Sequence, residues 1–305
     1  MICALLIFQT PDLPAPLWHL SPWLDTPDVP PSHVDTQLAR QQHRRFIKTH
    51  APLAAIPFDA RVTYVVTARH PVDAFISMYH QDRMIGPPPP GPPLVGGSPP
   101  PGPPLVGGPL PLGPPLVGGP PPFGPPSLVE PSPSGSPLLQ QHTGPPPRRG
   151  PRPPAVSRHE VHRAVLDWIG AGRSSARSPN SLPATMEHLA EAWSRRAEPN
   201  VVLVHYDDLR ADLEGQMRRL ADELGIAVAE PSWPTLAAAA TFESMRARDD
   251  VLVPPPPGIR ADTGLFFRRG TSGAAREVLA DDELAWYHSE IARLAPPDLV
   301  EWLHR

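Results

Sequence analysis

Apolar residues follow two different periods along this chain, and together they predict alternating strands and helices. A continuous β-branched and aromatic run at 62–68 and a second run at 200–206 are typical of strands that are buried on both faces, as in a parallel sheet. Pro71 and apolar residues at helical spacing follow the first run, so a strand, a tight turn and a helix are expected there. Strands that alternate with helices predict an α/β fold with a central parallel sheet.

Further helices are predicted by apolar residues that recur every three or four positions. The predicted ranges are 2–8, 159–169, 181–196 and 207–226. In the last of these, Gly225 suits the position just after the end of a helix. Residues 10–31 are predicted to form a loop whose apolar side chains cover a pocket or the core.

The composition changes abruptly at Gly86, where a segment rich in proline and glycine begins. Similar repeats start at Gly91, Gly102, Gly113 and Gly124, which gives a period of 11 residues. Proline has no amide donor and glycine adds chain entropy, so this segment is not expected to form a packed core. We therefore expect a disordered insertion at 86–157 within one folded domain, whose two parts are 1–85 and 158–305. Weak binding of domains that recognise PxxP segments is one hypothesis for the insertion, and repeat expansion without a function is the other.

Charge and cysteine content narrow the class of protein. The 305 residues carry a formal net charge of −4, which gives no support for nucleic-acid binding. The single cysteine, Cys3, excludes a disulfide framework and fits a reducing compartment. The sequence shows neither a targeting segment nor an apolar stretch near the ~20 residues that span a bilayer, so we expect a cytoplasmic protein.

Lys48 is the only lysine of the chain, and it lies two residues before His50. On a strand this spacing places both side chains on one face. A neutral imidazole can accept a proton from a hydroxyl group, and an ammonium ion can stabilise charge that develops on a transferred group. The pair is therefore a candidate catalytic site, with an unremarkable exposed strand edge as the alternative.

Two other stretches suit an anion. Arg69 follows the run at 62–68 directly, so it is expected at the carboxyl edge of the sheet, and Ser77 lies two turns along the next helix. The alternative is that Arg69 only forms an ion pair with Asp73. The stretch 266–273 contains two adjacent arginines and two glycines, and it predicts either a basic anion-binding loop or a solvated turn.

In their order along the chain, these motifs resemble the cytosolic-type sulfotransferases, which use 3′-phosphoadenosine 5′-phosphosulfate (PAPS) as donor. The resemblance is carried by Lys-Thr-His at 48–50, Arg-x-Pro-x-Asp…Ser at 69–77, Tyr-Asp-Asp at 206–208, Thr-Phe-Glu-x-Met at 241–245 and Arg-Arg-Gly at 268–270. It covers the chain except the proline-rich segment. The preference for Arg, Ala and Pro suggests a GC-rich genome, and the resemblance is to a bacterial member of the family. The resemblance implies a three-layer fold like that of the P-loop nucleotide kinases.

The resemblance also implies roles for individual residues. His50 would be the general base and Lys48 would stabilise the bridging oxygen and the leaving phosphate. The implied donor-binding residues are Arg69, Ser77, Tyr206, Thr241, Phe242, Arg268, Arg269 and Gly270. Among these, Tyr206, Thr241 and Phe242 would frame the adenine and the others would hold the 3′-phosphate. The acceptor would be a small molecule with a hydroxyl group, in a pocket lined by Trp18, Trp23 and Phe75, and no metal is implied.

One motif of the family has no counterpart in this sequence. Members begin with a strand and a Pro-Lys-Ser-Gly-Thr-x-Trp loop that binds the 5′-phosphosulfate, and no such stretch is found here. Our hypothesis is that Met1 is an internal methionine or that the gene is degraded, so that the first strand and the phosphate loop are missing. Residues 1–305 are then expected to bind PAPS poorly and to turn over little or nothing. The alternative function is a non-catalytic remnant or interaction protein that acts through its proline-rich segment. A kinase is disfavoured because the sequence has no GxxxxGK[ST] motif.

Overall fold

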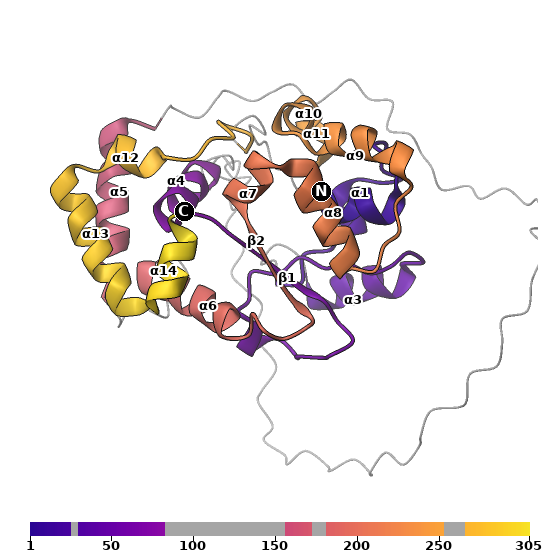
Figure 1. The fold of residues 1–305 in the computed structure, drawn as a ribbon, viewed down its shortest axis with the longest axis horizontal. Helices are drawn as coiled ribbons and strands as arrows, with labels where there is room; N and C mark the ends of the chain where they lie inside the picture. Colours follow the sequence, from indigo (N-terminus) through magenta and orange to yellow (C-terminus); the bar gives the residue numbers. More distant parts are fainter. Residues whose placement is uncertain (26–29, 83–155, 173–180, 253–265) are drawn as a thin grey trace, which may run out of the picture. The chain divides into compact units, whose positions relative to one another are not determined.

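Two parallel strands form the sheet in the computed structural model, which describes residues 1–25, 30–82, 156–172, 181–252 and 266–305. Strand β1 (Tyr64–Ala68) pairs with β2 (Val201–His205), with Ala68 opposite His205 (Figure 1). The predicted α/β fold with a parallel sheet is therefore confirmed. Burial on both faces is found for most of β2, but Thr67 in β1 is exposed, so that part of the prediction is wrong for β1. The reason is that, within the described ranges, only β2 pairs with β1.

Helices and short 3-10 turns make up most of the other regular structure. Their bounds are α1 (Ile2–Phe8), α2 (Leu17–Leu20), α3 (Pro31–Arg40), η1 (Leu53–Ala55), α4 (Pro71–Gln81), α5 (Arg158–Gly170), α6 (Leu182–Ser194), α7 (Tyr206–Ala211), α8 (Leu213–Glu223), η3 (Glu230–Ser232), α9 (Trp233–Ala240), α10 (Phe242–Ala247), α11 (Asp249–Leu252), α12 (Ala274–Val278), α13 (Asp281–Leu294) and α14 (Pro297–Leu303). No helix in the described ranges is both long enough and apolar enough to cross a bilayer.

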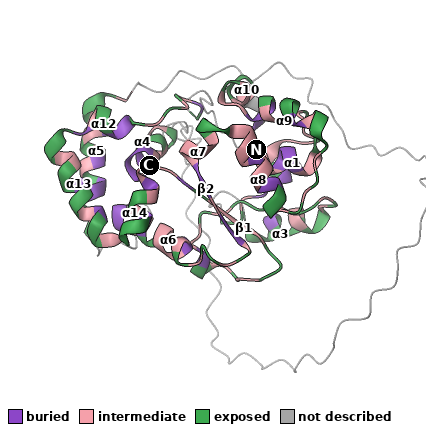
Figure 2. Cartoon of the chain, in the orientation of Figure 1, coloured by how far each residue is buried: buried purple, intermediate pink, exposed green. Residues whose placement is uncertain are grey.

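The helices bury their apolar faces in two clusters, one on each side of the strands. One cluster joins α4, α5, α6, α12, α13 and α14, and it includes Ala68 at the end of β1. The other joins α1, α8 and α9 with Val202 and Val204, which alternate along β2 and therefore share a face. Figure 2 shows this burial as purple bands on the helices. Each fully buried leucine, such as Leu5 in α1, stabilises the fold by about 1.5–3 kcal/mol. Helices thus cover both sides of the strands, as in the predicted three layers.

The region predicted as one helix at 207–226 is two helices, α7 and α8. The break is at Asp212, which has φ −146° and ψ 79°, and whose carboxylate accepts a hydrogen bond of 2.9 Å from the amide of Gly215. An aspartate that caps a helix in this way stabilises it by about 1 kcal/mol, so the local cap outweighs continuation of the helix. The prediction for Gly225 is confirmed, since its φ of +62° is the left-handed conformation expected just after a helix.

The predicted insertion at 86–157 lies outside the described residues except for its last two positions. Ser157 caps α5 by accepting a hydrogen bond from the amide of Glu160, whose carboxylate accepts in turn from the amide of Ser157. Residues Met1–Pro87 and Arg149–Arg305 belong to one structural unit. Helices α4 and α5, which flank the undescribed segment, pack against each other within that unit.

Candidate functional site

Lys48 and His50 contact the same aromatic side chain. Trp23 and Lys48 form an isolated parallel β-bridge, in which the amide of Lys48 donates to the carbonyl of Pro22 at 3.0 Å. The ammonium nitrogen of Lys48 lies 4.3 Å from the centre of the Trp23 ring, and the His50 ring lies 4.6 Å from it in an edge-on arrangement. The two predicted catalytic side chains are therefore close together, beside one indole.

Asp25 organises this group, although no sequence pattern singles it out. Its carboxylate accepts hydrogen bonds from the indole nitrogen of Trp23 at 2.5 Å, from the hydroxyl of Thr49 at 3.2 Å and from the amide of His50 at 2.9 Å. We call Trp23, Asp25, Lys48 and His50 the lysine–histidine cluster. An aspartate two residues after a tryptophan has no distinctive spacing. Its contacts with Thr49 and His50 follow from the β-bridge between Trp23 and Lys48, which brings the two segments together.

The charges of this cluster favour a neutral imidazole. Both side chains are exposed at the surface but partly desolvated by the protein around them. This partial desolvation lowers the pKa of His50, the positive charge of Lys48 lowers it further, and Asp25 opposes both. It also lowers the pKa of Lys48, again against the effect of Asp25. His188 on α6 is a second imidazole that acts electrostatically on His50, since η1, just after His50, packs against α6. His50 is therefore neutral near pH 7 and able to accept a proton.

A second group of side chains lies at the carboxyl edge of the two strands. Arg69 follows β1 and its guanidinium lies 4.4 Å from the centre of the Tyr206 ring, which opens α7 after β2. Its Nη2 donates to the carbonyl of Thr271 at 3.3 Å and lies 3.5 Å from a carboxylate oxygen of Asp73. The Nε of Arg69 is buried and has no hydrogen-bond partner among the described residues. Arg69 therefore lies beside Asp73, as the ion-pair alternative requires. Its Nε is also left without an acceptor, as an anion-binding role requires.

Gly270 lies directly against Phe242, one of the residues predicted to frame the adenine. It has a φ of +67°, and a Cβ atom built on it would lie 2.6 Å from the ring of Phe242. Phe242 opens α10, and Thr241 caps that helix by accepting from the amide of Ser244 at 3.2 Å. Glycine is therefore required at 270 both by its backbone conformation and by the aromatic ring against it.

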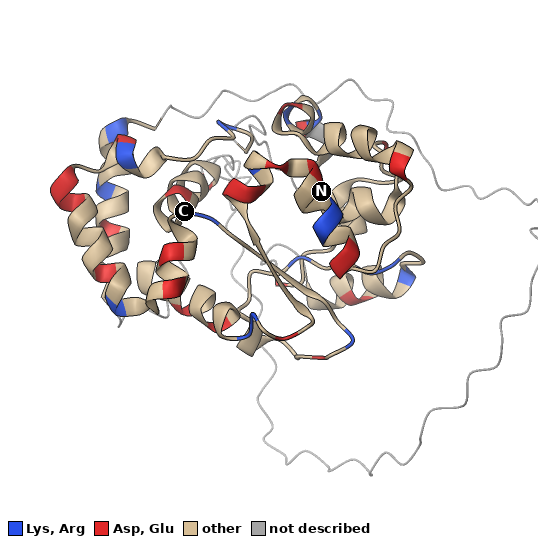
Figure 3. Ribbon diagram, in the orientation of Figure 1, with Lys and Arg blue, Asp and Glu red and all other residues tan. Residues whose placement is uncertain are grey.

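The two adjacent arginines of the loop differ in their surroundings. Arg269 forms a two-pronged ion pair with Glu277, with N–O distances of 2.5 and 2.7 Å. Arg268 is half-buried, and burial lowers its pKa; the positive charge of Arg269 lowers it further, Glu277 opposes this effect, and Arg69 adds a smaller decrease. Figure 3 shows this basic loop in blue ahead of α12. We call Arg69, Asp73, Tyr206, Arg268 and Gly270 the arginine cluster.

The remaining predicted residues are not all brought together. Ser77 is exposed on α4, one turn after Asp73. Phe75 stacks on Trp168 at 4.8 Å within a buried cluster that contains neither Trp18 nor Trp23, so the three predicted pocket residues do not form one pocket. The physical reason is that Phe75 faces inward from α4, whereas Trp18 is 45% exposed. No group of three or more metal-ligating side chains is found in the part of the chain that the structure describes.

Comparison with known proteins matches this arrangement to one family. The family model described as "Sulfotransferase domain" matches residues 3–95 and 176–291. A glycolipid sulfotransferase of Mycobacterium bovis (strain BCG / Pasteur 1173P2) is 34% identical over an alignment 315 residues long, which spans 99% of this chain and 82% of that protein. A glycolipid sulfotransferase of Mycobacterium tuberculosis (strain ATCC 25177 / H37Ra) is 33% identical over 314 residues, with the same coverage.

Solved structures give the same fold at low sequence identity. The mouse sulfotransferase SULT7A1 complexed with PAP superimposes with a TM-score of 0.57 at 14% identity, over 99% of this chain and 82% of that chain. A retinol dehydratase in a complex with retinol and PAP superimposes with a TM-score of 0.50 at 17% identity, over 92% and 71% of the two chains. Matches at this identity speak for the fold alone, but the family model and the two close relatives carry more. This chain belongs to the sulfotransferase family.

Proposed function

We propose that this chain moves the sulfuryl group of PAPS to a hydroxyl group of a small amphiphilic acceptor. The observation that carries the proposal is the buried, unpartnered Nε of Arg69 at the carboxyl edge of the strands. A buried donor without an acceptor costs about 1–3 kcal/mol, and a phosphate oxygen would remove that cost. Arg268 brings a second positive charge close to Arg69, so the pair suits a doubly charged group such as the 3′-phosphate of PAPS. The residues present therefore fit that part of the donor.

The donor side would be held by the arginine cluster. Arg69 and Arg268 would bind the 3′-phosphate, with Ser77 as a further hydroxyl donor from α4. Tyr206 and Phe242 would frame the adenine, and Thr241 would position Phe242 by capping α10. Arg269 contributes less in this proposal than the family resemblance implies, because its guanidinium is paired with Glu277. PAPS, when bound, supplies an activated sulfuryl group.

The lysine–histidine cluster would carry out the transfer. His50 is neutral and takes the proton of the acceptor hydroxyl while the acceptor oxygen forms its bond to sulfur. Lys48 places its ammonium ion where the bond between sulfur and the 5′-phosphate oxygen breaks and stabilises the charge left on that oxygen. The products are then the sulfate ester, adenosine 3′,5′-bisphosphate (PAP) and a proton on His50. Positioning and charge stabilisation account for most of the rate in a transfer of this kind.

Two exposed apolar side chains next to this cluster support an amphiphilic acceptor. Leu24 and Ile47 adjoin Trp23 and Lys48 in the chain and are 40% and 45% exposed. Exposed apolar groups in the two segments that carry the polar site favour a ligand that has both an apolar and a hydroxylated part. The relatives at 33–34% identity are named as glycolipid sulfotransferases, which fits such a ligand. A glycolipid hydroxyl is therefore our proposed acceptor.

Several predictions from the sequence remain predictions. They are the cytoplasmic location, recognition of the proline-rich segment by PxxP-reading domains, and slow or absent turnover by residues 1–305. A binding experiment distinguishes the enzyme from a non-catalytic remnant. Binding of PAP does not require turnover, so it can be measured even if residues 1–305 turn over slowly.

The direct test is retention of purified residues 1–305 on immobilised PAP, together with a sulfonation assay on a glycolipid. We expect the wild type to be retained through the 3′-phosphate, although turnover by residues 1–305 is predicted to be slow or absent. Arg69→Ala should lose about 100-fold in affinity, because a charged contact to that phosphate is removed. Arg61→Ala is the matched control, since Arg61 is an exposed arginine that pairs only locally with Asp59. Equal retention of wild type and Arg69→Ala would contradict the proposal, and retention of neither would favour the remnant.

A further inference from the structure

Asp73 is a buried carboxylate that connects two segments 200 residues apart in the chain. It lies in the first turn of α4 and is only 2% exposed. One of its oxygens accepts a hydrogen bond from the amide of Gly273 at 2.6 Å, and the other accepts from the amide of Ala275 at 2.8 Å. The same carboxylate lies 3.5 Å from Nη2 of Arg69.

These contacts compensate for the burial of a charge. A carboxylate that leaves water needs charged partners or several hydrogen bonds, and Asp73 has two amide donors and one guanidinium. The two amides can reach it because Gly273, with a φ of +95°, turns the chain just before α12. A backbone amide, unlike a side chain, cannot turn away without moving the chain. Two amides bound to one carboxylate therefore fix the position of the loop that precedes α12 relative to α4.

Asp73 also decides which edge of the Arg69 guanidinium is free. Nη2 faces Asp73 and the carbonyl of Thr271, and the ring of Tyr206 covers one face of the group. The Nε on another edge is buried without a partner among the described residues. A guanidinium carries five donors in a fixed plane, so holding one edge aims the rest.

We propose that Asp73 is a positioning residue, which holds the 268–273 loop and Arg69 so that Arg69 and Arg268 face one anion. This inference rests on the proposed function for the identity of that anion, the 3′-phosphate. Asp73 does not itself contact the donor, since a carboxylate would repel it. Its effect is to fix two positive groups from distant segments at one place, and its loss should therefore reduce selectivity for the 3′-phosphate.

The first test needs no variant. Hydrogen exchange of individual amides, measured by NMR on the wild type, should show Gly273 and Ala275 exchanging about tenfold or more slowly than Thr271 and Ser272, whose amides have no acceptor in the described structure. Equal exchange at all four amides would overturn the proposal, because the two bonds to Asp73 would then not persist in solution.

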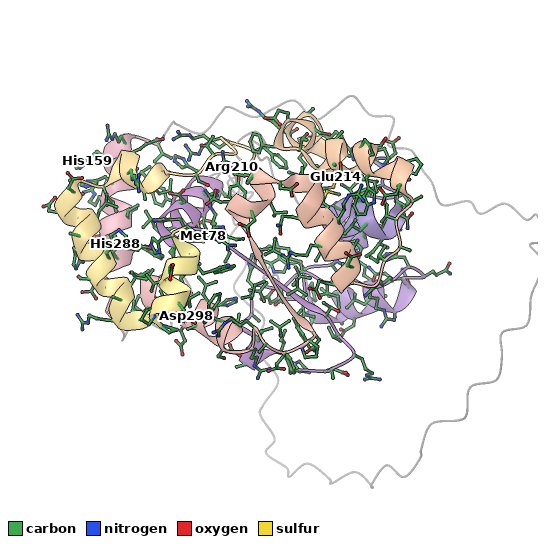
Figure 4. All side chains as sticks on the ribbon, in the orientation of Figure 1. Met78, His159, Arg210, Glu214, His288 and Asp298 are labelled. Carbon is green, nitrogen blue, oxygen red and sulfur yellow. The ribbon has the colours of Figure 1, made fainter. Side chains whose placement is uncertain are left out.

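The second test compares Asp73→Asn with wild type in the binding of PAP and of 5′-AMP, which lacks the 3′-phosphate. An asparagine offers only one acceptor atom, so we expect PAP affinity to fall by about tenfold or more while 5′-AMP affinity changes by less than about twofold. Asp298→Asn is the control, because Asp298 is an exposed carboxylate on α14, labelled in Figure 4. Melting temperatures of all three proteins show whether each is folded. If Asp73→Asn does not fold, the hydrogen-exchange measurement on the wild type tests the proposal instead.

The outcomes separate this inference from the proposed function. A wild type that prefers PAP over 5′-AMP, with the preference lost in Asp73→Asn, supports both. The same preference in wild type and Asp73→Asn supports the proposed function and overturns the role of Asp73. Equal losses for PAP and 5′-AMP would make Asp73 merely structural and also overturn it. A wild type without any preference would contradict the proposed function itself.

Discussion

The lysine–histidine cluster and the arginine cluster differ in how they are built. The first is made of loop residues 23–25 and 48–50, and Asp25, Lys48 and His50 are all exposed. The second starts at the ends of two strands and is joined to a loop 200 residues away through a carboxylate that is almost fully buried. One cluster is thus open to solvent, and the other is fixed by hydrogen bonds to the backbone.

This difference fits the two tasks that we propose. A site that binds the same donor in every reaction gains from being rigid before the ligand arrives, because less ordering is then needed on binding. A site that must admit a hydroxyl group and release a sulfate ester has to remain accessible. In this chain the buried carboxylate of Asp73 and the positive-φ Gly270 both lie on the donor side.

The largest expected difference between the clusters is in their response to acid. His70, next to Arg69, has its pKa lowered to about 4 by burial, with His304, His288 and Arg69 adding to the effect and Asp73 opposing it. An unfolded chain binds that proton near pH 6.5, so the stability due to neutral His70 is present above pH 6.5 and is lost as the pH falls toward 4. The loss should be about 3 kcal/mol in the free energy of unfolding.

Urea unfolding at pH 7 and pH 4.5 measures this effect. His70→Gln should remove about 2–3 kcal/mol of the loss between the two pH values, whereas His50→Gln in the exposed cluster should remove less. If His50→Gln flattened the pH dependence as much as His70→Gln, the contrast between a buried and an open cluster would be wrong.

A smaller effect is expected from the glycine of the basic loop. Gly270→Ala should destabilise the fold by about 2 kcal/mol, because the added methyl meets the Phe242 ring and the residue has a positive φ. Gly225→Ala is the matched control: its φ of +62° is similar, but a Cβ there meets nothing within 4 Å, so about 1 kcal/mol is expected. Thermal unfolding compares the two, and an equal cost would show that Phe242 does not pack on Gly270.

The smallest expected effect is a shift in the titration of Lys48. Because Asp25 raises the pKa of Lys48 against the effect of partial desolvation, Asp25→Asn should lower that pKa. Lys48 is the only lysine, so methylation with ¹³C-formaldehyde labels this side chain and the α-amino group alone, and NMR follows each with pH. Asp35→Asn, a change in an exposed residue of α3, should leave the titration unchanged. A rise in the pKa after Asp25→Asn would contradict the geometry of the cluster.

Local spacing predicted those parts of the fold and the site that depend on neighbours in the chain. Both strands, the helix after Pro71 and the turn at Gly225 follow from period and from glycine and proline positions. The shared side of Lys48 and His50 also follows from strand geometry. The break at Asp212 was missed because one side-chain cap outweighed a continuous apolar stripe.

Long-range pairing could not be derived from the sequence. Asp25 contacts His50 only through a bridge between two loops, and Asp73 contacts Gly273 only through the tertiary fold. Arg268 and Arg269 are adjacent and chemically identical in the sequence. They are distinguished in the structure because Arg269 forms hydrogen bonds with Glu277. Phe75 was assigned to a pocket because it is aromatic, but the face of α4 on which it lies is buried.

In the proposed function, Arg69 and Arg268, and not Arg269, face the 3′-phosphate. Isothermal titration of PAP and of 5′-AMP into Arg268→Ala and Arg269→Ala tests it most directly. We expect Arg268→Ala to lose about tenfold or more in affinity for PAP with little change for 5′-AMP, while Arg269→Ala, which breaks an exposed ion pair, should lose less than about threefold. A loss of PAP affinity in Arg269→Ala as large as that in Arg268→Ala would contradict it.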